Sequence, residues 1–141
     1  MLDGVTIGAA ARQSGVKVPT IRYYEQIGLL APPSRTESQR RLYGKADLRR
    51  LAFIRHAREL GFEVDAIRTL LTLQDDPHQS CAAADETARA RLAEVEQRIA
   101  SLLALRAELK RMVDGCANGH VCDCRVIETL ADQTHNHGRL A

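Results

Sequence analysis

The stretch Pro19-Thr-Ile-Arg-Tyr-Tyr-Glu-Gln-Ile27 decides the fold of the N-terminal half of the chain. Proline is tolerated in the first turn of a helix, and Gly28 follows directly, so the stretch predicts one short helix. Upstream, Thr6 is a suitable N-cap for a preceding helix, which Gly15 interrupts. A helix, a short glycine-containing turn and a second helix together form a helix-turn-helix motif.

The segment after this motif contains Pro32-Pro33 and cannot continue the helix. We interpret residues 34–43 as a short hairpin, or wing, that braces on the DNA backbone while the second helix reads the bases. Two more helices are expected, one from Asp47 to a stop at Gly61 and one over residues 65–73. Residues 1–74 are therefore predicted to be a winged helix-turn-helix DNA-binding domain.

The charge distribution also favours a polyanionic partner. The net charge is only +2, but residues 12–58 hold eleven Lys and Arg against three acids, whereas residues 69–141 hold eight against eleven. Double-stranded DNA fits this asymmetry, although a solvated charged face would have a similar composition. The candidate DNA contacts are Thr6, Val18, Pro19, Thr20, Arg22, Tyr23, Tyr24, Arg35, Arg40, Arg41, Tyr43 and Arg55.

A long helix is expected next, because residues 81–113 contain neither Gly nor Pro. Its apolar residues alternate at steps of four and three, with Arg106 at one position of the same seam: Ala88, Leu92, Val95, Ile99, Leu102, Leu109 and Val113. This heptad pattern predicts a coiled coil between two copies, because the remaining chain is too short to cover the seam. The fold is thus predicted to be all-α, with residues 75–114 as linker and dimerisation helix.

A metal-binding loop is predicted after this helix, where Cys116, His120, Cys122 and Cys124 lie within nine residues. Thiolate and imidazole at this spacing suit zinc or a softer metal. Cys124 precedes a predicted two-turn helix, whose N-terminus favours a thiolate. A structural zinc site and a redox pair of Cys122 with Cys124 are the alternatives. Residues 115–131 form this region, and residues 132–141, with His135 and His137 as a weak ligand pair, are expected to be a flexible tail.

The fourth cysteine, Cys81, lies at the opposite end of the long helix. About 35 residues at 1.5 Å each separate it from Cys116 by roughly 50 Å, so the two cannot share a metal within one chain. In an antiparallel dimer, the partner's Cys81 would lie beside the loop, giving two equivalent sites.

Other classes of protein fit less well. The N-terminus lacks a signal-peptide pattern and no apolar run approaches the roughly 18 residues of a membrane span, so we expect a cytoplasmic protein with reduced thiols and no membrane partner. No general base is arranged beside a nucleophile, so we do not expect an enzyme.

An ordered series of short motifs runs along the N-terminal half: Thr6-Ile7-Gly8, Val18-Pro19-Thr20-Ile21-Arg22-Tyr23-Tyr24-Glu25, Ile27-Gly28-Leu29-Leu30, Arg35, Arg41-Leu42-Tyr43, Phe53-Ile54-Arg55 and Leu60-Gly61-Phe62. In this series, and through the long helix and the cysteine loop, the chain resembles the MerR-type metal-responsive regulators. The resemblance implies a homodimer that binds an inverted repeat in a promoter with an overlong spacer. Inducer binding would distort the operator and realign the promoter for RNA polymerase, at a deformation cost of several kcal/mol.

The resemblance is strongest to the zinc and divalent-metal branch. Copper(I)-type members share the seven-residue gap between Cys116 and Cys124 but typically carry Ser in place of Cys81, and divalent-metal members have Cys there. Zinc-type members add a loop histidine, matched by His120, but usually begin the loop with two adjacent cysteines, where this chain has only Cys116 and then Cys122. The resemblance therefore implies Zn(II) first, then Cd(II), Pb(II) or Hg(II), and Cu(I) last.

Overall fold

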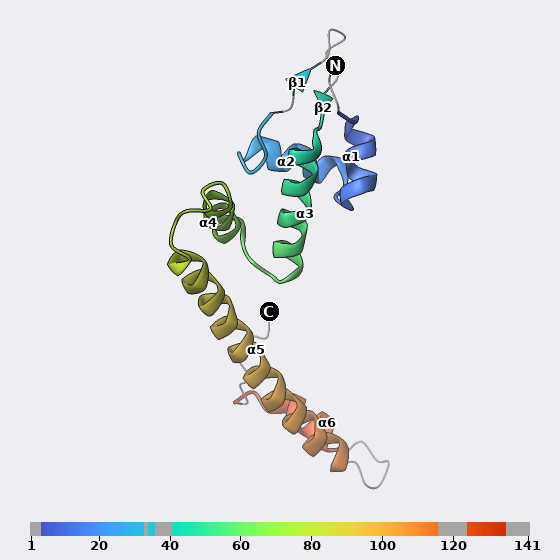
Figure 1. Cartoon of the computed structure of the whole chain (residues 1–141). Helices are drawn as coiled ribbons and strands as arrows, with labels where there is room; N and C mark the ends of the chain where they lie inside the picture. Colours follow the sequence, from blue (N-terminus) through green and yellow to red (C-terminus); the bar gives the residue numbers. More distant parts are fainter. Residues whose placement is uncertain (1–3, 33, 36–40, 116–123, 135–141) are drawn as a thin grey trace. The chain divides into compact units, whose positions relative to one another are not determined.

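The structure is a computed structural model that describes residues 4–32, 34–35, 41–115 and 124–134. Its described elements, in chain order, are the helices α1 (Ile7–Ser14) and α2 (Val18–Gln26), the strands β1 (Ser34–Arg35) and β2 (Arg41–Leu42), and the helices α3 (Lys45–Glu59), α4 (Val64–Gln74), α5 (Ala82–Asp114) and α6 (Arg125–Ala131) (Figure 1). The chain divides into two compact units, residues 1–88 and 89–141. The predominantly α-helical fold that the sequence predicts is confirmed.

The helix-turn-helix is formed by α1 and α2, as the sequence predicts. The Thr6 hydroxyl accepts a hydrogen bond from the Ala9 backbone N–H at 3.3 Å and caps α1. Gly15 ends α1 in the left-handed conformation, with φ of 75°, and donates its N–H to the Ala11 carbonyl. Pro19 lies in the first turn of α2, where its missing N–H costs nothing.

The wing is a short antiparallel hairpin. Ser34 pairs with Leu42 and Arg35 pairs with Arg41. The backbone of Val5 exchanges two hydrogen bonds with that of Tyr43, at 2.9 and 2.8 Å, so the chain before α1 is attached to the base of the wing.

The start of α3 corrects one expectation. The helix begins at Lys45 rather than Asp47, with Gly44 as its N-cap. Asp47 lies at the third helical position, and its carboxylate accepts the Gly44 N–H at 2.9 Å. The acidic residue therefore caps the helix from inside the first turn, which explains why the sequence signal was displaced by two residues.

The core of the first unit joins the helices α1 to α4. Its fully buried side chains include Ile21 from α2, Leu51 and Ile54 from α3, and Ile67 and Leu71 from α4. This shared core fixes α2 against the rest of the domain, so the outer face of α2 is presented on a rigid support.

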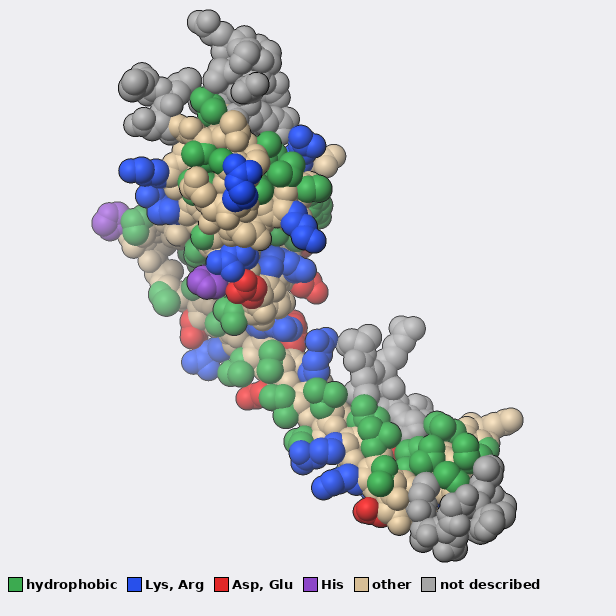
Figure 2. Space-filling model, turned by 90° about the vertical axis from the view of Figure 1, so that its right-hand side faces the viewer, with side chains coloured by type: hydrophobic (Ala, Val, Ile, Leu, Met, Phe, Trp, Pro, Cys, Tyr) green, Lys and Arg blue, Asp and Glu red, His purple; other side chains and the backbone are tan. Residues whose placement is uncertain are grey.

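The second unit has very little core of its own. Met112 is its only buried apolar residue among the described part of the chain. The predicted seam positions of α5 are instead about half exposed: Leu92 54%, Ile99 50%, Leu102 52%, Leu109 48% and Val113 68%. Figure 2 shows hydrophobic side chains along one face of α5, between charged ones. A single chain therefore leaves the heptad face uncovered.

Candidate DNA-binding surface and metal-binding segment

One face of α2 is open and carries most of the predicted DNA contacts. Pro19, Arg22 and Tyr23 are exposed, Tyr23 to 46%, while Ile21 and Tyr24 on the opposite face are buried. Positions spaced three and four apart share one side of a helix. The exposed guanidinium and phenol therefore project together from the second helix of the motif. Val18 and Thr20 are half-buried at the same end of α2.

Tyr24 is a core residue rather than a surface one. Its side chain is only 8% exposed, and its ring centroid lies 6.1 Å from that of Tyr23. Burial raises the pKa of the Tyr24 phenol above its usual 10.0, against the opposing pull of the Arg58 charge. The ring is packed in the core, and a contact of the Tyr24 hydroxyl with DNA stays a prediction.

Tyr43, another predicted DNA contact, is buried as well. It is fully buried, and its hydroxyl donates a hydrogen bond to the Glu25 carboxylate on α2. Its role is therefore structural, since the buried phenol ties the base of the wing to the second helix. The sequence of the wing does not predict that Tyr43 is buried, because its burial depends on α2 and on the chain before α1.

Arg55 is half-buried and already engaged. Its Nη1 lies 2.7 Å from a Glu59 carboxylate oxygen, and its Cδ lies 3.4 Å from where a Cβ on Gly15 would stand. No described residue accepts a hydrogen bond from its buried Nε. The Arg55 side chain therefore lies against the turn of the helix-turn-helix, and contact with a phosphate would compete with Glu59.

The remaining predicted DNA contacts are placed less fully. Thr6 is exposed and its hydroxyl caps α1. The backbones of Arg35 and Arg41 are paired in the hairpin register, and Arg40 lies outside the described residues.

The predicted metal ligands fall at two places along the chain. Cys81 is an exposed free thiol directly before α5, and Cys124 is half-exposed at the N-cap of α6. Cys116, His120 and Cys122, like His135 and His137, lie outside the described residues. Within the part that is described, no group of three or more His, Cys, Asp or Glu side chains could hold a metal.

The two residues that flank the cysteine loop lie in close contact. A Cβ on Gly115 would stand 2.5 Å from Cβ and 2.8 Å from Cγ of Arg125, and 3.3 Å from the Arg111 carbonyl oxygen. Only glycine fits at this approach. The end of α5 and the beginning of α6 are therefore held together.

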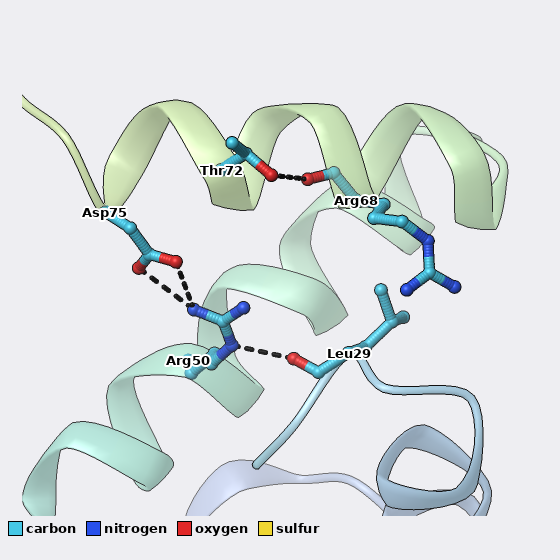
Figure 3. A network of polar contacts seen from close by, with 5 residues as sticks. All are labelled: Leu29, Arg50, Arg68, Thr72 and Asp75. Carbon is cyan, nitrogen blue, oxygen red and sulfur yellow. Dashed lines mark hydrogen bonds and ion pairs between the residues drawn. The ribbon is translucent and has the colours of Figure 1, made fainter.

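Arginines of α3 and α4 form a polar network with the turn that follows α2, and the sequence does not predict it (Figure 3). Arg50 of α3 donates from Nε to the Leu29 carbonyl at 2.7 Å and from Nη1 to both Asp75 carboxylate oxygens at 3.0 and 3.2 Å. Arg68 of α4 donates from Nη2 to the Ile27 carbonyl at 2.9 Å. These partners are 21 to 41 positions apart in the sequence. No local pattern reports such a distance, so the sequence carried no signal for the network.

Comparison with known proteins agrees with this geometry. Residues 5–74 match the model of the MerR HTH family regulatory protein, and residues 48–112 match the MerR, DNA binding model. The HTH-type transcriptional regulator ZntR of Escherichia coli strain K12 is 43% identical over 128 residues, covering 88% of this chain and 90% of that protein. The chain belongs to the MerR family.

Other MerR-family relatives are similar over nearly their whole length. Heavy metal-dependent transcription regulator 2 of Rhizobium meliloti strain 1021 is 41% identical, over 91% of this chain and 87% of that protein. The crystal structure of PbrR691 from Ralstonia metallidurans CH34 in complex with lead(II) superposes with a TM-score of 0.77 at 35% identity, covering 90% and 99% of the two chains.

Membership of the MerR family makes the chain a DNA-binding transcriptional regulator, which binds promoter DNA as a dimer, and not an enzyme. None of the helices in the described part of the chain is both long and apolar enough to span a membrane.

Proposed function

We propose that this MerR-family protein activates transcription in response to a divalent metal ion, with Zn(II) as the first candidate and Cd(II), Pb(II) or Hg(II) as alternatives. As a homodimer, it would bind an inverted repeat in a promoter and distort the operator when the metal binds, so that RNA polymerase can use the promoter. A cytoplasmic location, where thiols stay reduced, is part of the proposal.

The DNA-binding part of the proposal rests on the open face of α2. Arg22 and Tyr23 are exposed side by side on a helix whose other face is anchored in the core. A guanidinium can meet a phosphate or the edge of a guanine, and a phenol can reach a phosphate. Because the helix is firmly supported, a change in its orientation would be passed to the bound DNA.

The dimer of the proposal would be built on the α5 seam. Five apolar side chains per chain are about half exposed there, and burying the exposed surface of each one would contribute about 1 kcal/mol. Ten such side chains give on the order of 10 kcal/mol, enough to hold two helices together after the entropic cost of association. An antiparallel arrangement would bring the partner's Cys81 to the end of α5, where the cysteine loop begins.

The contact between Gly115 and Arg125 is the observation that carries the metal-binding part. Cys116 follows Gly115 and Cys124 precedes Arg125 in the sequence, so their neighbours are already held together. We propose that this contact keeps the two thiols within reach of one ion. The exposed Cys81 of the partner subunit would add a third thiolate, and His120 and Cys122 complete the donor set.

The choice among metals rests on the donors. Mixed thiolate and imidazole ligands suit zinc, whereas thiolates alone suit softer ions. The structure of PbrR691 contains lead(II), and a 38% identical relative from Pseudomonas fluorescens is named as a mercuric resistance operon regulatory protein. His120 is the residue that puts Zn(II) ahead of these ions for this chain.

The test is in vitro transcription from a long-spacer promoter, with Zn(II), Cd(II), Pb(II), Hg(II) and Cu(I) titrated at buffered free concentrations. We expect one divalent ion to activate at the lowest free concentration, and Cys81→Ser to abolish that response without weakening operator binding. Cys122→Ser is the matched thiol control. If it abolishes the response while Cys81→Ser does not, and an oxidant replaces the metal, the loop is a redox sensor.

A structural zinc site would give a different pattern. Removing the metal would then unfold the protein or dissociate the dimer, whereas a sensor remains a folded, DNA-bound dimer without metal. Sedimentation and operator binding after chelation separate these outcomes.

A further inference from the structure

The turn that follows α2 is held by two arginines from other helices. Its carbonyls at Ile27 and Leu29 flank Gly28, which has φ of 81°. Arg68 of α4 donates to the first carbonyl at 2.9 Å, and Arg50 of α3 donates to the second at 2.7 Å. The C-terminal end of α2 is therefore held by arginine side chains from α3 and α4 in addition to its own backbone hydrogen bonds.

Arg50 extends this contact to the end of α4. Asp75 is the C-cap of α4, and both its carboxylate oxygens accept from Nη1 of Arg50 (Figure 3). The Thr72 hydroxyl donates to the Arg68 carbonyl one turn earlier on the same helix. Both arginine contacts therefore lead from the α2 turn to α4, one directly through Arg68 and one through Arg50 and Asp75.

These polar contacts span a space that side chains do not fill. An open hollow of about 440 Å³ is lined by Gly28 and Ala31 after α2, by Asp47, Arg49 and Arg50 on α3, and by Gln74 and Asp75 at the end of α4. Here the end of α4 is linked to the α2 turn across a hollow by the Arg50 contacts, in addition to the core that Leu29 and Leu71 share. A shift at the end of α4 can then reach α2 through the Arg50 guanidinium.

Asp75 lies close in sequence to the predicted metal ligand Cys81. Asp75 ends α4, Cys81 follows six residues later, and the first turns of α5 up to Ala88 belong to the same compact unit. The Arg50–Asp75 ion pair is largely exposed, with 27% and 60% of the two side chains accessible, and such pairs contribute little to stability. Its loss should therefore leave the domain folded and remove only the link between Asp75 and the α2 turn.

We propose that Arg50, Asp75 and Arg68 are positioning residues that couple the junction of α4 and α5 to the orientation of α2. This linkage makes the placement of the DNA-reading helix depend on where the end of α4 lies. It rests on the proposed function, because a metal bound through Cys81 would act on the segment directly after Asp75.

The test compares Asp75→Asn with Glu94→Gln. The Arg91–Glu94 pair within α5 has the same 3.0 Å separation, and its carboxylate is 62% exposed against 60% for Asp75, but both partners lie in one helix. Each change removes one negative charge from an ion pair of similar length and exposure. Only Asp75→Asn cuts the linkage to α2.

The first readout is the ratio of metal-induced to metal-free transcription with the operator saturated. We expect Asp75→Asn to lower this ratio about twofold to fivefold, because the coupling cannot exceed the interaction free energy of an exposed ion pair, while Glu94→Gln leaves it at the parent value. Arg50→Lys keeps the charge but cannot hold both partners with a planar fork, so it should act in the same direction. A purely structural role would lower induced and basal transcription by one common factor and leave the ratio unchanged, which would overturn the proposal.

The second readout needs no metal. The amides of Gly28, Leu29 and Leu30 donate to the Glu25 and Tyr24 carbonyls at 2.9 to 3.2 Å. Their hydrogen exchange should be several-fold faster in Asp75→Asn than in Glu94→Gln. If no metal induces the parent protein, the proposed function fails while faster exchange still supports the linkage. Unchanged exchange overturns the linkage whatever the metal response.

Discussion

The two compact units of this protein differ in how many of their apolar side chains are buried within one chain. Residues 4–88 surround one core, in which eight large side chains are less than 2% exposed. Among the described residues after Ala88, only Met112 is a buried apolar residue, and five seam side chains of α5 are about half exposed. The first unit is stabilised within one chain, whereas the described part of the second leaves its apolar α5 face exposed. In the proposed function, DNA reading is thus built on a rigid core, and metal sensing on a dimer interface.

The largest expected effect comes from breaking the core of the first unit. Leu51 is fully buried on α3, so Leu51→Ala should lower the free energy of unfolding by about 2–5 kcal/mol through lost burial and a residual cavity. All the tyrosines of the chain lie in this unit, so tyrosine fluorescence during denaturant unfolding reports on it alone. A loss below about 1 kcal/mol would mean that the core relaxes around the cavity.

The next effect should appear in the second unit and leave the first intact. Leu102→Glu places a carboxylate in the middle of the predicted seam, where the partner helix would bury it. We expect the dimer dissociation constant to rise at least tenfold, equivalent to about 1.4 kcal/mol, as measured by sedimentation. Tyrosine fluorescence should report an unchanged midpoint for the first unit.

Ala104→Glu is the control for the seam. Ala104 is exposed on α5 but lies outside the heptad positions, so the same charge should leave dimerisation unaffected. If both variants dissociate alike, α5 does not pair through the predicted seam.

A substitution on the exposed face of α2, which is predicted to contact DNA, can be made without changing the core of the first unit. Arg22→Ala should weaken operator binding by about 1–3 kcal/mol if the guanidinium contacts a base, with little change in stability because Arg22 is exposed. A phosphate contact would instead reduce the dependence of binding on salt by about one charge. Fluorescence anisotropy at several salt concentrations distinguishes the two, and Lys110→Ala on α5 is the control for loss of a positive charge.

The sequence predicted the elements well and the roles of single side chains less well. Capping at Thr6, the stop at Gly15, proline at the start of α2 and the heptad of α5 are local signals, and each describes an element that the structure contains. Tyr24 and Tyr43 are predicted DNA contacts because they lie on the second helix and in the wing, and the structure places both side chains in the core. Their burial depends on side chains from several elements, which no local pattern shows.

The same limit applies to the arginine network. Arg50 looks like an ordinary surface charge in the sequence, and its meaning comes from Leu29 and Asp75, which only the fold brings to it. The cysteine loop shows the reverse case. The sequence indicates possible metal ligands in this loop by their type and spacing. The structure adds that the flanking residues, Gly115 and Arg125, are in contact.

The smallest effect should separate a core phenol from a DNA contact. Burial raises the pKa of Tyr24 above 10.0, so the folded protein keeps this proton at a pH where the unfolded chain loses it. The unfolded state then binds fewer protons, and stability falls as the pH rises above the unfolded value. Denaturant midpoints measured from neutral pH to about pH 11 should fall less steeply in Tyr24→Phe than in the parent protein.

A result at neutral pH completes the argument for Tyr24. If its hydroxyl reaches a phosphate from the edge of the core, Tyr24→Phe weakens operator binding even where the alkaline loss of stability is absent. If operator affinity is unchanged and the two stability curves diverge only above pH 10, Tyr24 acts through the core alone. Parallel curves over the whole pH range would instead show that the phenol is hydrated in the folded protein. Tyr24 would then have its ring in the core and its hydroxyl at the surface that is predicted to contact DNA.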